Sequence, residues 1–357
     1  MKQGLAVVVA VLCLTIAESS YAIVFDPFVT SAELIGAVGN DDAIGFSFAG
    51  NKFVGSIYHN NQLYQTDLAG NNAQVFGAPL PHPGDPGEIY VSSSLGLGGF
   101  ASRDIFAGSQ NSGTVWTYAN GASSGDAATV FASGLTGGVR SIAFDPYGNY
   151  GYDMIVATFA GRIYRIDSSG AATEIANLGV DTEGLDFAPQ AFGPHPAGTL
   201  FVLSEGDGHV RAISPTGEVT DLGLQFNTPE MLSFVPLDFN LTLDPLAGFY
   251  AARYPTEVVH AAASEFAAYV GQAVITEENT HLLYAIAWNG SQFTTQSLGD
   301  FGGQPEDGIF VTAAILDPGC TTRPGGCNTS VPEPATLGLV GLVLLGMVSV
   351  RGRKRLM

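Results

Sequence analysis

The sequence predicts an all-β fold, a single β-propeller of about six four-stranded blades, and three observations favour it. Glycine is abundant, at 46 of 357 residues, while charged residues make up only 13% of the chain. Short β-branched or aromatic runs alternate with Gly, Asn, Asp and Pro, a pattern typical of strands and turns. These runs recur with a period of roughly forty-odd residues, which indicates repeated structural units.

The first 22 residues have the features of a secretory signal peptide. Lys2 supplies a positive start, and residues 5–17 form a 13-residue apolar run that is too short to span a bilayer. Ser20-Tyr21-Ala22 then places small residues before a cleavage point. We therefore expect export and a mature chain that begins at Ile23.

The body of the chain contains a short repeated element of the form acid–x–apolar–x–aromatic. Its clearest copies are Glu-Gly-Leu-Asp-Phe and Glu-Met-Leu-Ser-Phe, and one copy has arginine in place of the acid. The copies begin at Asp42, Glu88, Arg140, Glu183, Glu230 and Glu306, with the register at Glu88 and Glu306 uncertain by one residue. The number of copies predicts six blades, and five or seven blades are the alternatives.

A second element follows most copies and consists of three strands separated by turns. The expected strands are 53–58, 63–67 and 73–76; 103–107, 114–118 and 129–131; 153–158, 161–167 and 172–176; 199–203, 209–213 and 218–222; 248–254 and 257–261; and 273–277, 282–288 and 293–298. The 76 residues from Glu230 to Glu306 indicate a missing or degenerate copy there. We also expect a short helix over 262–269, and ring closure by pairing of the last motif with N-terminal strands.

Both faces of the expected strands are largely apolar, so each sheet needs neighbouring sheets on both sides. Radial repetition of four-stranded blades supplies these neighbours and protects the sheet edges. A pair of β-sandwiches is the structural alternative. The repeated acid favours the propeller over this alternative, because a pair of sandwiches does not require an acid at the same position of successive strands.

The charge balance restricts the class of partner. Residues 23–330 contain 8 of the 13 Lys and Arg residues and 31 of the 33 acids, a formal charge of −23. Such a surface repels phosphate backbones, which excludes nucleic acid as a partner. Solubility is the simplest explanation, and divalent cations or basic partners are the others.

The repeated acids are expected to meet at one mouth of the central channel, because the innermost strand of each blade lines it. Asp42, Glu183, Glu230 and Glu306 are the candidate channel residues. Carboxylates that close cannot all stay ionised without a cation, an arginine or raised pKa values. Arg140 is the candidate partner and Ca²⁺ the candidate ligand. The alternative is that the acids cap strand ends by accepting backbone N–H bonds.

The remaining candidate sites are weaker. Cys320 and Cys327 are expected to form a disulfide in an oxidising compartment, because the only other cysteine leaves with the signal peptide. Residues 145–153 are rich in oxygen ligands but lack EF-hand spacing, so a plain turn is expected and a Ca²⁺ site is the alternative. The histidines lack metal-ligand spacing. No nucleophile elbow, Walker loop or dinucleotide fingerprint is present, so no catalytic residue is assigned.

The C-terminus has three parts in a fixed order. A short motif is followed by the 16-residue apolar run 335–350, near the lower limit of the roughly 17–25 residues that a membrane helix needs. Basic residues end the run and are expected to stay on the cytoplasmic side. The motif is Val331, Pro332, Glu333 and Pro334, and the basic stop is Arg351, Arg353, Lys354 and Arg355.

This order resembles the PEP-CTERM sorting signal of exopolysaccharide-producing Gram-negative bacteria. The resemblance implies transient anchoring in the inner membrane through the C-terminal helix. It also implies cleavage by an exosortase, a membrane protease, with delivery to the cell surface or the extracellular space. An ordinary tail anchor is the alternative.

The strand motif with its Gly-rich strand pair resembles the six-bladed propellers of the SMP-30/gluconolactonase and NHL-repeat type. In the SMP-30 type a Glu, an Asn and an Asp from different blades hold a divalent metal that polarises a lactone. Glu183 or Glu230 matches the Glu by its motif, whereas the Asn and the Asp have no match in this sequence. Residues 266–275 are also similar to a late blade of soluble quinoprotein sugar dehydrogenases, over too short a stretch to transfer cofactor residues.

These observations predict a signal peptide (1–22), a propeller domain (23–318), a linker with the cysteine pair (319–330) and a sorting signal (331–357). We expect an exported, non-catalytic propeller that binds exopolysaccharide or an envelope protein, with Tyr and Phe in its loops as stacking surfaces for sugars. The alternative function is a divalent-metal-dependent lactonase or hydrolase at the channel mouth. A quinoprotein-like dehydrogenase is a third hypothesis.

Overall fold

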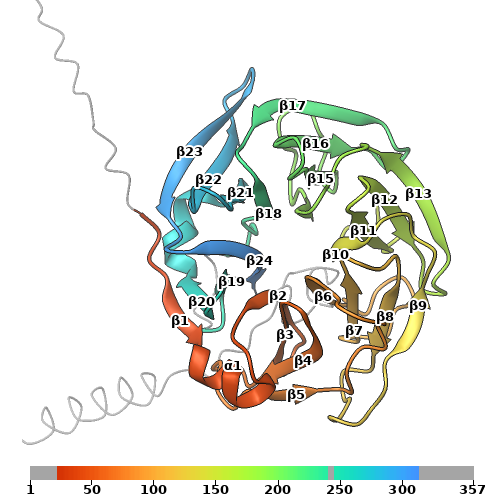
Figure 1. Ribbon diagram of the computed structural model, residues 1–357. Coiled ribbons are helices and arrows are strands. Elements are labelled where there is room, and N and C mark those ends of the chain that lie inside the picture. Colours follow the sequence, from red (N-terminus) through yellow and green to blue (C-terminus); the bar gives the residue numbers. More distant parts are fainter. Residues whose placement is uncertain (1–21, 240–244, 313–357) are drawn as a thin grey trace, which may run out of the picture. The chain divides into compact units, whose positions relative to one another are not determined.

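The computed structural model describes residues 22–239 and 245–312, which form a ring of six four-stranded antiparallel sheets (Figure 1). The innermost strands are β2, β6, β10, β14, β18 and β24, and each contacts the next in a closed cycle. The predicted all-β, six-bladed propeller is therefore confirmed.

The first four blades are simple meanders in which consecutive strands pair from the centre outward. Blade 1 contains β2 (Ala43–Phe48), β3 (Phe53–Ile57), β4 (Asn60–Thr66) and β5 (Gln74–Phe76); blade 2 contains β6 (Ile89–Ser93), β7 (Ile105–Ser109), β8 (Val115–Tyr118) and β9 (Thr129–Ala132). Blade 3 contains β10 (Val139–Phe144), β11 (Met154–Thr158), β12 (Arg162–Ile166) and β13 (Ala172–Asn177); blade 4 contains β14 (Leu185–Phe187), β15 (Leu200–Leu203), β16 (His209–Ile213) and β17 (Val219–Gln225).

The last two blades are interleaved in the sequence. Blade 5 contains β18 (Pro229–Phe234), β21 (Ala273–Glu277), β22 (Leu282–Trp288) and β23 (Phe293–Asp300), and blade 6 contains β24 (Gln304–Val311), β19 (Gly248–Tyr254), β20 (Glu257–Ala262) and β1 (Asp26–Val29). The prediction of a missing motif copy is wrong, because the long interval holds the β19–β20 hairpin of blade 6. This hairpin separates β24 from β1, so the two ends of the ring share a sheet without pairing directly.

Burial on both faces is visible in the middle strands. Along β11, Met154 and Val156 pack into the layer shared with blade 2, whereas Ile155 and Ala157 pack into the layer shared with blade 4. Successive side chains of a strand point to opposite faces of the sheet, so an unbroken apolar run fills two layers. Burial of each large side chain stabilises the fold by roughly 1.5–3 kcal/mol.

A short helix, α1 (Ser31–Val38), precedes blade 1 and was not predicted. The hydroxyl of Thr30 accepts a hydrogen bond from the backbone of Glu33 at 3.4 Å. Gly39 adopts φ +83° at the other end and donates its N–H to the carbonyl of Ile35. With only eight residues, the helix is too short to show apolar periodicity, and its caps define it instead.

The helix expected over 262–269 is present as the 3₁₀ helix η1 (Ala263–Tyr269), with Phe266 buried against blade 6. Among the described residues, no helix has the length and apolar character needed to cross a bilayer. Several predictions fall outside the described residues, namely the signal peptide up to residue 21, the Cys320–Cys327 disulfide and the sorting signal 331–357.

Candidate functional site

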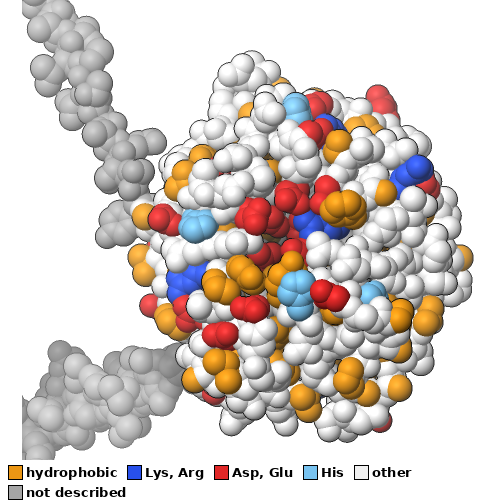
Figure 2. Space-filling model, in the orientation of Figure 1, with side chains coloured by type: hydrophobic (Ala, Val, Ile, Leu, Met, Phe, Trp, Pro, Cys, Tyr) orange, Lys and Arg blue, Asp and Glu red, His pale blue; other side chains and the backbone are white. Residues whose placement is uncertain are grey.

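The repeated motif positions of five adjacent blades gather at one mouth of the channel. Each lies no more than two residues from the first residue of an inner strand, and they are Glu88, Arg140, Glu183, Glu230 and Glu306. Figure 2 shows acidic side chains and a basic one at the centre of this face. Arg140, Glu183, Glu230 and Glu306 are only 3–5% exposed. We call this cluster, together with the adjoining turn residues Asp181, Glu205 and Glu278, the acidic mouth.

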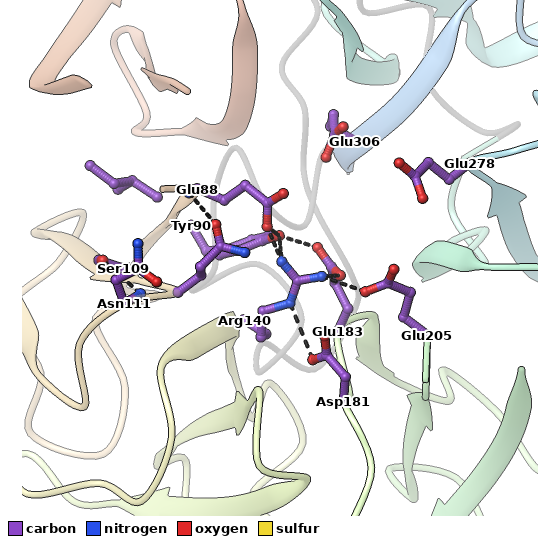
Figure 3. Close-up of polar contacts among 12 residues, drawn as sticks. Glu88, Tyr90, Ser109, Asn111, Arg140, Asp181, Glu183, Glu205, Glu278 and Glu306 are labelled. Carbon is purple, nitrogen blue, oxygen red and sulfur yellow. Dashed lines mark hydrogen bonds and ion pairs between the residues drawn. The ribbon is translucent and has the colours of Figure 1, made fainter. Parts of the chain in front are cut away.

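Arg140 is the centre of the acidic mouth (Figure 3). Its Nη1 bonds to Glu88, its Nε lies 3.2 Å from Oδ1 of Asp181, and its Nη2 bonds to Glu183 and lies 2.6 Å from Oε2 of Glu205. Burial works to lower the pKa of Arg140, but the surrounding carboxylates outweigh it and raise the pKa overall. The guanidinium is therefore a permanent cation that links blades 2, 3 and 4.

Tyr90, on β6, completes the shell around this guanidinium. Its hydroxyl bonds to Glu183 and lies 2.8 Å from Oε2 of Glu88, and it accepts a bond from Nη1 of Arg140 at 3.1 Å. Its ring also lies under the guanidinium at 5.6 Å. Burial, with the charge of Glu183, raises the pKa of Tyr90 well above its usual value, so the phenol stays neutral and remains a donor.

The acidic mouth holds more carboxyl groups than its one arginine neutralises. One carboxylate oxygen from each of Glu183, Glu205 and Glu230 lies within 4.8 Å of the others. Burial raises the pKa of Glu183 and of Glu230 well above the usual range. The charge of Glu230 adds to the rise at Glu183, and the charges of Glu306 and Glu205 add to the rise at Glu230.

The negative charge extends toward blade 6. The amide of Gln304 donates at 2.8 Å to both Glu278 and Glu306. Burial raises the pKa of Glu306 well above its usual value, and the charges of Glu183 and Glu278 raise it further. On the other side of the mouth, burial raises the pKa of Asp181 to about 7, although Arg140 opposes the rise.

This arrangement permits two kinds of chemistry. Oxygen ligands from Glu183, Glu205 and Glu230 suit a hard cation such as Ca²⁺. However, Nη2 of Arg140 already bonds two of these carboxylates, so a metal ion there competes with the guanidinium. Carboxyl groups with raised pKa values beside ionised ones also match the requirement for a general acid.

Asp42, the remaining predicted channel residue, does not bond to Arg140. Its carboxylate accepts a bond from the side chain of Asn40 at 2.9 Å. Burial raises the pKa of Tyr254, and the charges of Asp42 and Glu306 contribute, which places both acids near that tyrosine. Within the described ranges, Asp42 makes no ion pair with Arg140.

Backbone capping, the alternative role for the repeated acids, is found at different positions. Asp186 accepts from the backbone N–H of Phe234 in the next blade at 2.7 Å, and Asp307 accepts from that of Phe46 at 3.3 Å. Burial raises the pKa of Asp186 to about 6 and that of Asp307 to about 7, while these backbone bonds oppose the rise. These aspartates tie neighbouring inner strands together.

Sequence reasoning missed the turn residues of the acidic mouth, Asp181, Glu205 and Glu278. Glu205 and Glu278 each follow the second strand of their blade, in blades 4 and 5. If whole blades are aligned, rather than inner strands alone, Glu205 and Glu278 fall at equivalent positions, and this equivalence would have predicted both. Asp181 lies in an irregular segment before β14 and has no such signal.

A second feature lies at the opposite end of the channel, in the oxygen-rich loop 145–153. The buried carboxylate of Asp145 accepts backbone N–H bonds from Tyr147, Gly148, Tyr150 and Tyr152 at 2.7–3.1 Å. The loop is thus a turn built around its first residue, and these backbone donors occupy both oxygens that a cation would need. The side chains of Tyr147 and Tyr152 remain 43% and 38% exposed.

Comparisons with known proteins identify the C-terminal segment. The model of the PEP-CTERM protein-sorting motif matches residues 330–354, so the sequence prediction of this sorting signal is confirmed. The motif indicates export, with processing by exosortase at the membrane.

The remaining comparisons concern the whole chain. No curated protein matches it. Solved structures that match include a catalytically inactive virginiamycin B lyase from Staphylococcus aureus with quinupristin, at 11% identity and a TM-score of 0.46, covering 77% of this chain and 74% of that one. The selenomethionine form of that lyase matches at 12% identity and a TM-score of 0.44, with the same coverage.

Proposed function

We propose that this chain is an exosortase substrate whose propeller, once exported, binds a polysaccharide at the cell surface or in the extracellular matrix without acting on it. The observation that carries the proposal is the pair of exposed tyrosines, Tyr147 and Tyr152, on the loop organised by Asp145. A tyrosine ring offers a flat apolar face with a polar tip, which suits the face of a sugar ring.

The loop is rigid before any ligand arrives. Four backbone bonds to Asp145 hold it, and the ring of Tyr152 packs against Gly148, where an added Cβ would come within 2.7 Å of Cζ. Burial raises the pKa of Tyr147, and the charge of Asp186 raises it further, so its hydroxyl stays protonated. Tyrosines held in this way lose little conformational entropy when they bind.

The proposed binding face is distinct from the acidic mouth. Arg140 lies near the start of β10, whereas the loop follows the end of that strand. The loop between β6 and β7 adjoins it, because an added Cβ at Gly98 would lie 2.8 Å from the carbonyl oxygen of Tyr152. A long polymer therefore has an extended surface on this face.

The test is a binding comparison on the exported protein. The polysaccharide made by the producing cells is titrated against the wild-type protein, a Tyr147→Ala/Tyr152→Ala double variant and a Phe159→Ala control. Phe159 is 55% exposed and follows β11 at the end of blade 3 that lies on the face of the acidic mouth, so it is as exposed as the tyrosines but lies on the opposite face. Only the double variant is expected to lose binding.

A divalent-metal-dependent hydrolase of the SMP-30 type is the second candidate function. The close approach of Glu183, Glu205 and Glu230 supports it, since a cation there would polarise a lactone carbonyl. Two observations weigh against it. Arg140 already bonds two of the three carboxylates, and the Asn and Asp that complete the metal set in the resembling family have no match here.

A further inference from the structure

We infer that a small monovalent anion, of the size of chloride, binds at Arg103 in the corner between blades 1 and 2. Arg103 is only 7% exposed, and both of its terminal nitrogens, Nη1 and Nη2, are buried without a hydrogen-bond partner. A buried guanidinium without an acceptor costs several kcal/mol in the folded state. An acceptor from outside the chain removes that cost.

The backbone fixes this side chain in place. Arg103 adopts φ +65°, an uncommon conformation for a residue with a Cβ, and donates its N–H to the carbonyl of Ser94 at 3.0 Å. Its stem lies beside Gly50, and its guanidinium lies over the ring of Phe48 at 5.4 Å. The ring of Phe48 attracts the guanidinium from one face by a cation–π interaction. The ring supplies no hydrogen-bond acceptor for the N–H groups, which lie in the plane of the guanidinium.

The corner is also positive within an acidic protein. Among the described Lys and Arg residues, only Lys52 and Arg103 make no ion pair. Lys52 belongs to the same corner, since its Nζ donates to the carbonyl of Asn120 at 2.8 Å while the side chain of Asn120 donates to Ala49. Burial lowers the pKa of both Lys52 and Arg103, as expected for cations that lack a counter-charge.

One carboxylate, that of Asp104, adjoins the corner, but it bonds to the backbone and not to Arg103. Asp104 follows Arg103 in the chain, and its Oδ1 accepts the backbone N–H of Asn120 at 3.1 Å. It forms no salt bridge with Arg103 among the residues that the structure describes. The ion pairs of the described residues therefore leave the charge of the buried Arg103 guanidinium uncompensated.

Enclosure determines the kind of anion. The terminal nitrogens of Arg103 have no exposed surface, so a sugar acid or a protein carboxylate reaches them only if the loop opens. A water molecule accepts a hydrogen bond but leaves the charge uncompensated. A halide does both, because it accepts N–H bonds from all directions and carries one negative charge.

The experiment compares thermal unfolding of the mature protein in chloride and in gluconate at equal ionic strength, so that general screening is held constant. The melting temperature of the wild type is expected to rise with the logarithm of the chloride concentration once that concentration exceeds Kd, by roughly 5 °C at a hundredfold excess over Kd. Arg103→Met loses this dependence and, without chloride, is at least as stable as the wild type. Arg162→Met, at an exposed ion pair, keeps the chloride dependence.

Crystals grown in bromide provide an independent readout. An anomalous peak within bonding distance of Nη1 or Nη2 is expected. The inference is overturned if that position shows only water, or if Arg103→Met responds to chloride as the wild type does. If Arg103→Met does not fold, Lys52→Met, which removes the neighbouring cation, is expected to weaken the wild-type chloride response; an unchanged response contradicts the inference.

Discussion

Arg140 on β10 donates from Nη2 to Oε2 of Glu205, in the neighbouring blade, at 2.6 Å. The same nitrogen bonds to Glu183, so a single buried cation joins two carboxylates that would otherwise repel each other. The guanidinium of Arg140 therefore stabilises the acidic mouth. Replacement of Arg140 is the most direct way to measure that stabilisation.

Arg140→Met is expected to destabilise the protein by about 3–5 kcal/mol, because it leaves buried carboxylates without their counter-ion. Urea unfolding of the mature protein measures the loss. The control is Arg162→Met, whose pair with Glu174 is about one-third exposed and is expected to contribute at most ~1 kcal/mol. Equal losses in the two variants would show that Arg140 is not the centre of the mouth.

Stability in the absence of metal is expected to fall as the pH rises from about 4.5 to 7. Burial raises the pKa of Glu183, Glu230 and Glu306 well above the usual range and that of Asp181 to about 7. The folded protein therefore holds more protons than the unfolded chain in this interval, and each deprotonation favours unfolding.

Urea unfolding at pH 5 and pH 7.5 measures this slope. Glu230→Gln, which keeps the shape of the side chain but cannot ionise, is expected to flatten it. A free energy of unfolding that increases over the same interval would contradict the raised pKa values.

Calcium separates the two candidate functions. In the proposed binding function, lactones are not hydrolysed faster in the presence of the protein, with or without Ca²⁺. If Ca²⁺ competes with Arg140 for Glu183 and Glu205, it is expected to stabilise Arg140→Met more than the wild type, measured as the shift in melting temperature. Metal-dependent lactone turnover that is lost in Glu230→Gln would favour the hydrolase instead.

The sorting signal makes a separate prediction about the fate of the chain. Replacement of Pro332, Glu333 and Pro334 by alanine is expected to block processing, so that the full-length protein stays with the membrane fraction. Mass spectrometry of extracellular protein checks this outcome. Release of the variant at the wild-type level, lacking its C-terminal segment, would show that the motif does not direct cleavage.

The positions of the inner strands were predicted well from the sequence. The motif copies at Glu88, Arg140, Glu183, Glu230 and Glu306 all lie at or just before inner strands, because alternation and the repeated acid are local signals. Assignment of the β19–β20 hairpin to blade 6 depends on ring closure across the whole chain. No local pattern carries that information.

The same division holds for the site. The acids of the inner strands were predicted, whereas Asp181, Glu205 and Glu278 come from turns whose paths depend on packing between blades. The burial of Arg103 had no signal, since a single arginine at the start of the expected strand 103–107 normally faces solvent. Its burial follows from the left-handed backbone at that residue and from contact with Phe48 of the adjacent blade.

The most direct test of the proposed function is the affinity of the exported protein for the polysaccharide of the producing cells. The Tyr147→Ala/Tyr152→Ala variant is expected to bind at least about tenfold more weakly than the wild type, because truncation of exposed aromatic anchors typically costs 1 kcal/mol or more each. The double variant is expected to remain folded, because both rings lie on a surface loop, and Phe159→Ala is expected to bind normally. Full affinity in the double variant, or no binding by the wild type, would contradict the account.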